Sequence, residues 1–416
     1  MRGFFLYSKY LRNALTHFFH LLPKQSFDII LVGATGFTGQ RAARYLHQHA
    51  PDSLRWGLAA RNSSKLESIA GQLNISGDRL FTVDTLNRQQ VDQLVQQSRI
   101  IITTVGPFSL YGEQLIASCS EHGTHYLDIT GEVGFIRKMK EKYQQTAIEN
   151  KCKLIPFSGF DSVPADIAAF LLSREFAKPD KLTIRAYYSI RGGFNGGTIA
   201  TMMNKFESGE YKQMNNPALL ITDASQQIEK DPLQNYFGFS SDINRWVTPF
   251  IMSPINSKVV YNTAAEMRKQ GKPYAERMSY QEFSSLGKKY NPVSFFITAL
   301  ILLAITKLGP KKWFRTILQN IMPAPGEGPS EEAIENGYFK MRAIASDETG
   351  LTKQLTMSYP GDPGNKSTVF FLCESALCLA LNPSLNDRYG FLSPVLAFED
   401  ALVDRMTQQQ LSLSIS

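Results

Sequence analysis

The chain has 416 residues, 43% of them hydrophobic, which suffices for two domains and excludes a disordered protein. The formal net charge of +7 and the pI near 9.0 are moderate. Aromatic and basic residues do not interleave as in RNA-binding proteins, which argues against nucleic acid and leaves an anionic lipid surface or an acidic carrier protein as partner. The four cysteines are few and form no CxxC pair, which predicts reduced thiols in a cytoplasmic protein and no metal site.

Residues 1–25 form a basic amphipathic segment at the N-terminus. Arg2, Lys9, Arg12 and Lys24 alternate with aromatic and aliphatic side chains, and no acidic residue is present in residues 1–24. The segment lacks the continuous apolar core and the cleavage site of a secretory signal. This composition predicts a helix that lies on a membrane surface.

An apolar strand at residues 27–32 runs directly into three glycines spaced three apart. Gly33 permits a tight turn, Gly36 lets the backbone approach a pyrophosphate, and Gly39 allows the next helix to pack on the sheet. The N-terminus of that helix favours negative charge. The pattern predicts a dinucleotide-binding loop, with a purely structural turn as the alternative. The expected cofactor-binding residues are Gly33, Ala34, Thr35, Gly36, Phe37, Thr38 and Gly39.

A second strand, at residues 54–60, indicates which dinucleotide binds. NAD enzymes usually place an acidic residue at the end of this strand to hold the ribose hydroxyls. Here the strand is followed by Arg61, Asn62 and, further on, Lys65. A guanidinium at this position pairs with a 2′-phosphate, with Ser63 and Lys65 as helpers, so the sequence favours NADP(H) over NAD(H). Arg61, Asn62 and Lys65 are the cofactor-binding residues expected here. The alternative is that Arg61 and Lys65 are solvated charges at the start of a helix.

Strands and helices alternate over residues 26–175, which predicts a doubly wound parallel sheet, a Rossmann domain. Further strands are expected at 79–83, 99–105, 125–129 and 154–157, and helices at 88–96, 111–121, 132–150 and 165–172. Ligands in this fold lie beyond the carboxyl ends of the strands. We therefore expect Gly106, Pro107 and Phe108 to line the cofactor.

The sequence lacks one proton relay that is common in reductases. No tyrosine is followed four residues later by a lysine, the pair that lowers the phenol pKa in short-chain reductases. Other candidate proton donors lie near the carboxyl ends of predicted strands: Tyr111, Tyr126, Asp128, Glu132 and Asp161. Asp128 and Asp161 are equally suited to capping helices, and Tyr126 to the core.

Residues 176–390 are expected to form a second, α+β domain. A strand at 182–190 leads into a glycine-rich turn at 191–198, which either binds an anion or is a hairpin tip. Thr198 is expected to cap the helix that follows. The polar residues 204–248 suit a lid or a partner surface.

The rest of the second domain mixes strands and helices. A loop at 322–329 precedes a hairpin of strands at 338–345 and 351–359. Helices are expected at 366–380 and 394–406, the latter within a C-terminal helix and tail at 391–416.

Residues 293–305 are continuously apolar apart from single serine and threonine residues, with lysines and aromatic residues on both sides. The run is shorter than the roughly 20 residues that a membrane-spanning helix needs. Two interpretations remain open: a buried core helix, and a helix that dips into one face of a membrane.

Taken together, several short motifs resemble the saccharopine dehydrogenase-like oxidoreductases. These are residues 33–39, 59–62, 105–108, 111–112, 125–132 and 159–164. Within this family, the chain resembles the branch that contains the mycobacterial trans-acting enoyl reductase and a lipid-droplet-associated animal protein. Over residues 27–405, this resemblance implies an N-terminal NADP-type Rossmann domain, a C-terminal α+β domain that closes over it, and membrane or lipid association.

We therefore expect an NADPH-dependent oxidoreductase that adds hydride to an electron-poor carbon, such as that of an unsaturated thioester or an imine. The resemblance implies an acyl or lipid-like substrate, free or carrier-bound, in lipid or glycolipid biosynthesis, and a cytoplasmic enzyme associated peripherally with membranes. Two alternatives stay open: a membrane-surface protein that binds NADPH without turnover, and a saccharopine-type amino acid dehydrogenase. A homodimer is also left open. An apolar cleft with one polar end would favour the acyl substrate, and two or more arginines would favour a dicarboxylic amino acid.

Overall fold

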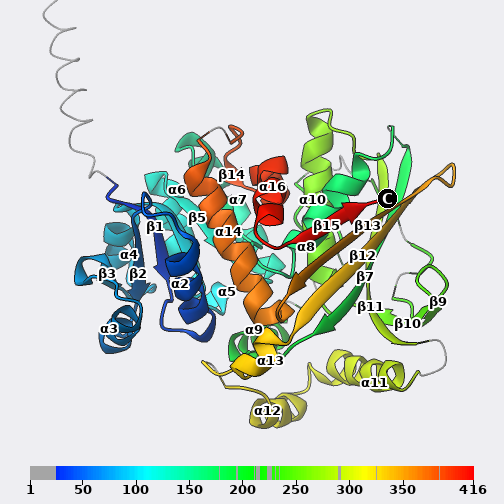
Figure 1. Cartoon of the computed structure of the whole chain (residues 1–416), viewed down its shortest axis with the longest axis horizontal. Coiled ribbons are helices and arrows are strands. Elements are labelled where there is room, and N and C mark those ends of the chain that lie inside the picture. Colours follow the sequence, from blue (N-terminus) through cyan, green and yellow to red (C-terminus); the bar gives the residue numbers. More distant parts are fainter. Residues whose placement is uncertain are drawn as a thin grey trace, which may run out of the picture.

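The computed structural model describes residues 25–177, 179–193, 195–209, 211, 216–222, 227–229, 231–233, 235–288, 292–324, 326–383 and 385–416. The predicted amphipathic segment at 1–25 lies outside these residues except for Gln25. Two β-sheets organise the described chain, and helices cover both faces of the first sheet (Figure 1).

The first sheet has the strand order β14-β6-β5-β4-β1-β2-β3, and all its neighbouring strands are parallel. Its strands are β1 Phe27–Val32, β2 Trp56–Ala60, β3 Leu80–Thr82, β4 Ser98–Thr103, β5 His125–Asp128, β6 Lys153–Ile155 and β14 Gly390–Phe391. The central strands carry nearly continuous buried aliphatic runs, as expected when helices cover both faces. The predicted doubly wound N-terminal domain is confirmed, and its strand order reverses between β1 and β4, where ligands bind in this class of sheet.

Successive residues of β1 point into two different hydrophobic clusters. Ile29 and Leu31 pack with one set of helices, and Ile30 and Val32 pack with the other. The first set includes α2 Phe37–His49, α3 Ser63–Gln72, α8 Val163–Ser173 and α14 Thr368–Leu381. The second set includes α4 Arg88–Val95, α6 Glu113–His122 and α7 Val133–Glu149.

The C-terminal part of the chain is shared between the two sheets. Helix α14 runs alongside α2 (Figure 1), and the hydroxyl of Tyr45 on α2 donates to Glu374 on α14 at 2.7 Å. Strand β14 then joins the first sheet, whereas β15 Ser412–Ile415 joins the second. The expected boundary at residue 390, between the second domain and the C-terminal segment, therefore does not separate the strands of the two sheets.

The second sheet is mixed, with the order β15-β13-β12-β7-β11-β10-β9, and β8 pairs with β11. Its other strands are β7 Lys181–Arg191, β8 Gln227–Ile228, β9 Gly238–Ser240, β10 Arg245–Pro249, β11 Arg277–Lys288, β12 Tyr338–Asp347 and β13 Thr352–Pro360. The predicted β12–β13 hairpin forms, and Asp347 Oδ1 accepts the N–H groups of Thr349 and Leu351 in its turn. The α+β class of the second domain is confirmed.

Seven helices among the described residues complete this half of the molecule or connect it to the first. They are α9 Gly196–Ser208, α10 Ser253–Lys269, α11 Val293–Leu308, α12 Lys312–Ile321, α13 Glu331–Glu335, α15 Pro394–Phe398 and α16 Asp400–Gln408. The single helix predicted at 394–406 is wrong, because Glu399 has a positive φ of 47° that separates α15 from α16. The predicted Thr198 cap is also wrong: Asn195 is the N-cap of α9, and its Oδ1 accepts the N–H of Thr198 at 3.0 Å.

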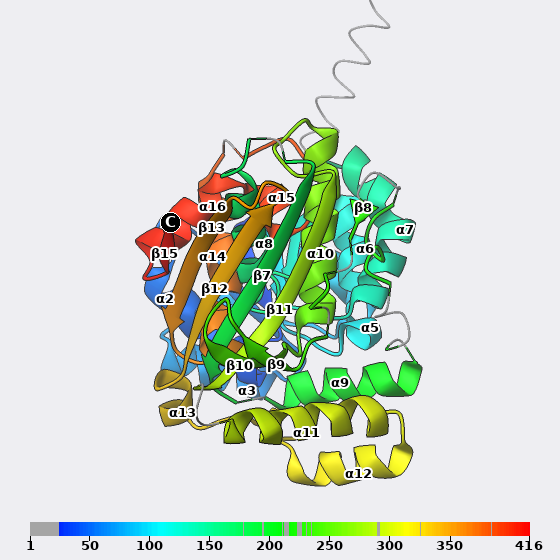
Figure 2. The ribbon, with the colours of Figure 1, turned by 90° about the vertical axis from the view of Figure 1, so that its right-hand side faces the viewer.

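The apolar run at 293–305 forms most of α11, but it is not a core helix. Of the described side chains of α11, only that of Phe295 is buried, whereas Phe296 and Leu300 are 62% and 68% exposed. Figure 2 shows α9, α11 and α12 stacked at one end of the molecule. No helix among the described residues is long and apolar enough to cross a membrane.

Candidate functional site

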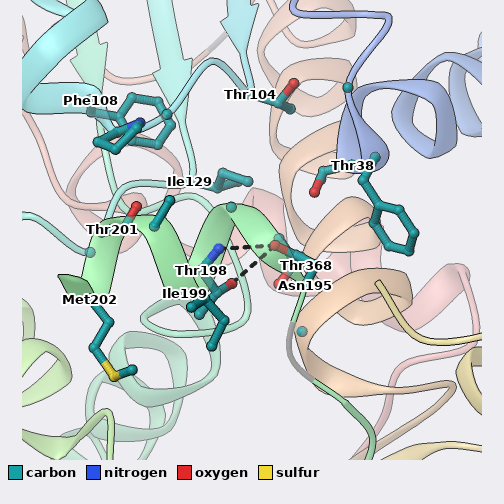
Figure 3. A pocket seen from close by; sticks show the side chains of 18 of the residues that line it. Thr38, Thr104, Phe108, Ile129, Asn195, Thr198, Ile199, Thr201, Met202 and Thr368 are labelled. Carbon is teal, nitrogen blue, oxygen red and sulfur yellow. Dashed lines mark hydrogen bonds between the residues drawn. The ribbon is translucent and has the colours of Figure 1, made fainter. Parts of the chain in front are cut away.

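A cavity of about 820 Å³ lies between the carboxyl ends of the first sheet and the second domain. Figure 3 shows Thr38, Thr104 and Phe108 on its Rossmann side and Thr198 and Ile199 of α9 facing them. The cavity is therefore at the switch point of the parallel sheet, where the fold class predicts a ligand.

The glycine loop has the geometry of a phosphate cradle. Gly33 has a φ of 90°, and a Cβ on Gly39 would lie 2.0 Å from the carbonyl oxygen of Gly33. A Cβ on Gly36 would meet only that oxygen, at 3.4 Å, so this glycine leaves open space at the cavity. Within the described part of the chain, no side chain caps the start of α2, whose N-terminus faces the cavity. The loop thus fits a pyrophosphate.

Some of the predicted loop residues line the cavity, and others are buried between the loop and α2. Those that line the cavity are Gly33, Thr35, Gly36, Phe37 and Thr38. Ala34 and Gly39 are buried in the contact between loop and helix and do not line it.

Of the three cofactor-binding residues expected after β2, only Arg61 lines the cavity. Its side chain is exposed, and no carboxylate of the described residues pairs with it. Asn62 caps α3 instead, since its Oδ1 accepts the N–H of Lys65 at 2.9 Å. Three lining residues at the end of β3 were missed by sequence reasoning: Val83, Asp84 and Thr85.

Gly106, Pro107 and Phe108 line the cavity as expected, and Glu132 holds this turn from behind. The Glu132 carboxylate accepts the N–H groups of Phe108 at 2.6 Å and Ser109 at 3.1 Å, at the start of α5 Phe108–Tyr111. Glu132 is fully buried and does not line the cavity. This candidate proton donor is therefore a positioning residue.

Asp128 is also buried away from the cavity. It accepts the hydroxyl of Tyr126 at 2.7 Å and the N–H groups of Thr130 at 2.9 Å and Phe157 at 3.2 Å. Burial raises the pKa of Asp128 to about 7, although these hydrogen bonds lower it. The pair of Asp128 and Tyr126 orders the loop after β5 and has no access to a ligand in the cavity.

Asp161 and Tyr111 are the two candidates that do line the cavity. Neither side chain makes a hydrogen bond to another described residue. Burial raises the pKa of Asp161 to about 6, and the nearby ammonium group of Lys205, which also lines the cavity, lowers it. A carboxyl group that titrates near neutral pH is suited to proton transfer.

A buried polar cluster centred on Glu282 of β11 stands behind Asp161. Glu282 accepts the hydroxyls of Tyr188 at 3.0 Å and Tyr280 at 2.8 Å and the amide of Asn256 at 2.9 Å. Burial raises the pKa of Glu282 to about 7, and the charge of Asp161 contributes to the rise. The Tyr188 ring stacks at 4.4 Å on Phe250, which lines the cavity, so the cluster supports that wall.

The comparisons with known proteins agree with this architecture. The saccharopine dehydrogenase NADP binding domain matches residues 29–153. A Mycobacterium tuberculosis protein named after the trans-acting enoyl reductases is 31% identical over 414 residues, covering 94% of this chain and 97% of that protein. The trans-acting enoyl reductase of Mycobacterium ulcerans is 28% identical, covering 92% and 96%.

Solved structures share the fold at low sequence identity. Saccharopine dehydrogenase (L-Glu forming) from Saccharomyces cerevisiae gives a TM-score of 0.54 at 10% identity and covers 94% of this chain and 100% of its own. The homospermidine synthase of Legionella pneumophila, solved with NAD, gives 0.51 at 10% identity and covers 94% and 91%. The chain belongs to the saccharopine dehydrogenase-like family and is an NAD(P)H-dependent oxidoreductase.

NADP(H) is the cofactor of this domain family, and the residues present fit it. The loop at 33–38 is shaped for the pyrophosphate, the N-terminus of α2 favours its charge, and Arg61 is free to pair with the 2′-phosphate. Gly106, Pro107 and Phe108 would then lie along the bound dinucleotide.

Proposed function

We propose that this oxidoreductase reduces the conjugated double bond of an acyl substrate, free or carrier-bound, in lipid or glycolipid biosynthesis. The observation that carries the proposal is the wall of the cavity beyond the cofactor loops. It is apolar, and its side chains come from both domains: Ile129, Phe160, Ile190, Ile199, Met202, Phe206, Phe250, Met252, Ile255, Ile305 and Met322. Such walls suit an acyl chain.

The cations in the cavity argue against a dicarboxylic amino acid as substrate. Among the described lining residues, the one arginine is Arg61, on the cofactor side, and the one lysine is Lys205. Lys205 already donates to the carbonyl oxygen of Gly131 at 2.7 Å. A saccharopine-type substrate carries several carboxylates, and burying them without arginine partners is unfavourable.

The bound cofactor would supply a hydride for the β-carbon of the conjugated system. The chain's own residues must then provide a proton for the α-carbon and donors for the carbonyl oxygen. Asp161 in its protonated form would donate this proton within the cavity, and Lys205 would stabilise the carboxylate that remains after transfer. The Tyr111 hydroxyl, which has no partner among the described residues, donates a hydrogen bond to the oxygen that gains negative charge.

The test is an assay of NADPH consumption with α,β-unsaturated acyl thioesters. We expect a saturated product that carries deuterium at the β-carbon when the cofactor is labelled on its reactive carbon. Asp161→Asn should lower kcat by about 100-fold or more, because a general acid contributes at least that factor. Tyr111→Phe should also slow turnover, whereas Tyr143→Phe, which removes a hydroxyl outside the cavity, should not.

The assay also decides between the candidate substrates. If the enzyme oxidised a dicarboxylic amino acid with NADP+ and left every enoyl thioester unchanged, the acyl proposal would be wrong. NADPH binding without turnover of either class would support the non-catalytic alternative.

A further inference from the structure

Most of the large hydrophobic side chains exposed by the described residues lie on α11 and α12. We call them the apolar face of α11 and α12: Val293, Phe296, Ile297, Leu300, Ile301, Leu303, Trp313, Ile317 and Ile321. Trp313, Ile317 and Ile321 are spaced four residues apart and form one stripe along α12. Exposed apolar surface of this extent marks an interaction site.

The opposite sides of both helices are already packed on the body of the protein. Leu318 of α12 lies in a cluster with Ile199 and Met203 of α9. The Phe295 ring of α11 contacts the Trp246 ring of β10 at 5.0 Å. The apolar face is therefore the outer side of helices that are anchored at their inner side, at the end of the molecule seen in Figure 2.

The charged side chains of α11 and α12 themselves are all basic. The sequence contains no acidic residue between Glu282 and Glu327, but it contains Lys288, Lys289, Lys307, Lys311, Lys312 and Arg315. Lys307, Lys311 and Lys312 are exposed at the ends of the two helices, and Arg315 pairs with Glu207 of α9 at 3.6 Å. Lysines that flank an exposed apolar helix attract anionic headgroups.

We propose that α11 and α12 dock the protein on an anionic lipid bilayer. The apolar face would insert among the headgroups, and the lysine ammonium groups would pair with the negative charges of the lipids. The charge argues against a second copy of the chain, because a two-fold interface would bring the same lysines together. The nine exposed apolar side chains argue against an acidic carrier protein that binds through the lysines alone, because such a partner would leave these side chains in water.

The cavity extends to these helices. Its lining includes Ile305 of α11 and Met322 after α12, together with Met202 and Phe206 of α9. An acyl chain in the bilayer would therefore meet apolar side chains where these helices border the cavity. This loading route rests on the proposed function, whereas the docking itself does not.

The docking is tested with the full-length protein and vesicles of phosphatidylcholine, alone or mixed with phosphatidylserine. We expect sedimentation with the anionic vesicles and at least a tenfold loss of binding for Leu300→Glu. Lys311→Glu and Lys312→Glu should each weaken binding by about fivefold or more, with the effect fading at high salt. Leu351→Glu is the matched control, since Leu351 is 48% exposed in the β12–β13 hairpin and should bind as the wild type does.

The contrary outcomes are distinct. Unchanged vesicle binding by Leu300→Glu would overturn the docking proposal, as would equal absence of binding for both proteins. A third outcome is that neither protein binds vesicles and light scattering gives the mass of a dimer for the wild type and of a monomer for Leu300→Glu. That outcome would show that a second copy of the chain covers the apolar face.

A second readout separates docking from catalysis. Leu300 does not line the cavity, so Leu300→Glu should reduce a short water-soluble enoyl thioester as fast as the wild type. Its reduction of a long-chain enoyl substrate carried in anionic vesicles should fall in step with vesicle binding. If neither protein reduced the soluble thioester but only the wild type bound vesicles, the proposed function would fail and the docking would stand.

Discussion

Glu132 accepts the backbone N–H of Phe108 at 2.6 Å and thereby ties α7 to the turn that lines the cofactor side of the cavity. The carboxylate is fully buried, so its removal leaves the N–H groups of Phe108 and Ser109 without partners. Glu132→Ala should lower the free energy of unfolding by about 2 to 3 kcal/mol in urea denaturation and weaken NADPH binding. Glu121→Ala removes an exposed carboxylate that pairs with Arg88, and it should change stability by less than about 0.5 kcal/mol. Unchanged stability of Glu132→Ala would contradict the positioning role.

Gly36 and Gly39 should respond differently to the same substitution. A Cβ at position 39 would lie 2.0 Å from the carbonyl oxygen of Gly33, so Gly39→Ala must displace backbone and should cost about 1 to 3 kcal/mol of stability. A Cβ at position 36 meets nothing closer than 3.4 Å, but it points into the space expected for the pyrophosphate. Gly36→Ala should therefore unfold at nearly the wild-type urea concentration and lose most of its NADPH affinity. If a stable Gly36→Ala variant kept its NADPH affinity, the assignment of Gly36 to the pyrophosphate site would be wrong.

Arg61 should determine the preference for NADPH over NADH. Its guanidinium lines the cavity and is not paired with any carboxylate of the described residues. A 2′-phosphate can therefore accept two hydrogen bonds from this guanidinium. Arg61→Asp should weaken NADPH binding by about 10- to 100-fold in a fluorescence titration and leave NADH binding nearly unchanged. Lys65→Ala, outside the cavity, should have less than about a threefold effect. Equal losses of affinity for NADPH and NADH would show that Arg61 does not bind the 2′-phosphate.

The Rossmann half of the cavity was predictable because its signals are local. The three glycines and Arg61 follow buried strands directly, and their roles depend on the backbone within a few residues. The α9 wall was not predictable, since Ile199 and Met202 reach the cavity only through the packing of two domains. Glu282 gave no signal either: β11 places polar Tyr280 and Glu282 in the interior, so its sequence lacks the apolar pattern of a strand.

Residues 293–305 illustrate a second limit of sequence patterns. An apolar run that is too short to cross a bilayer fits a core helix and a surface helix equally well. The two interpretations differ in whether other elements cover the helix, and among the described side chains of α11 only that of Phe295 is buried. The helix cap at Asn195 was missed by three residues for a simpler reason, because both asparagine and threonine are good caps and only the backbone shows where α9 begins.

Asp161 should lower the free energy of unfolding of the protein at high pH, although the residue is needed for activity. Burial raises its pKa in the folded protein to about 6, above the ordinary value of 3.8, while Lys205 opposes the rise and the charge of Glu282 lies nearby. The folded state therefore keeps this proton to a higher pH than the unfolded chain does, so stability is lost as the pH rises from about 4 to about 6. Asp161→Asn removes the titrating group, and its unfolding free energy should exceed that of the wild type by about 2 to 3 kcal/mol at pH 8 and match it at pH 4. Urea denaturation at both pH values measures the difference, with the exposed Asp52→Asn as a control that should differ from the wild type at neither pH. The same Asp161→Asn variant should be slow in the enoyl thioester assay, and a variant that is both slow and no more stable at pH 8 would show that Asp161 is not desolvated in the folded protein.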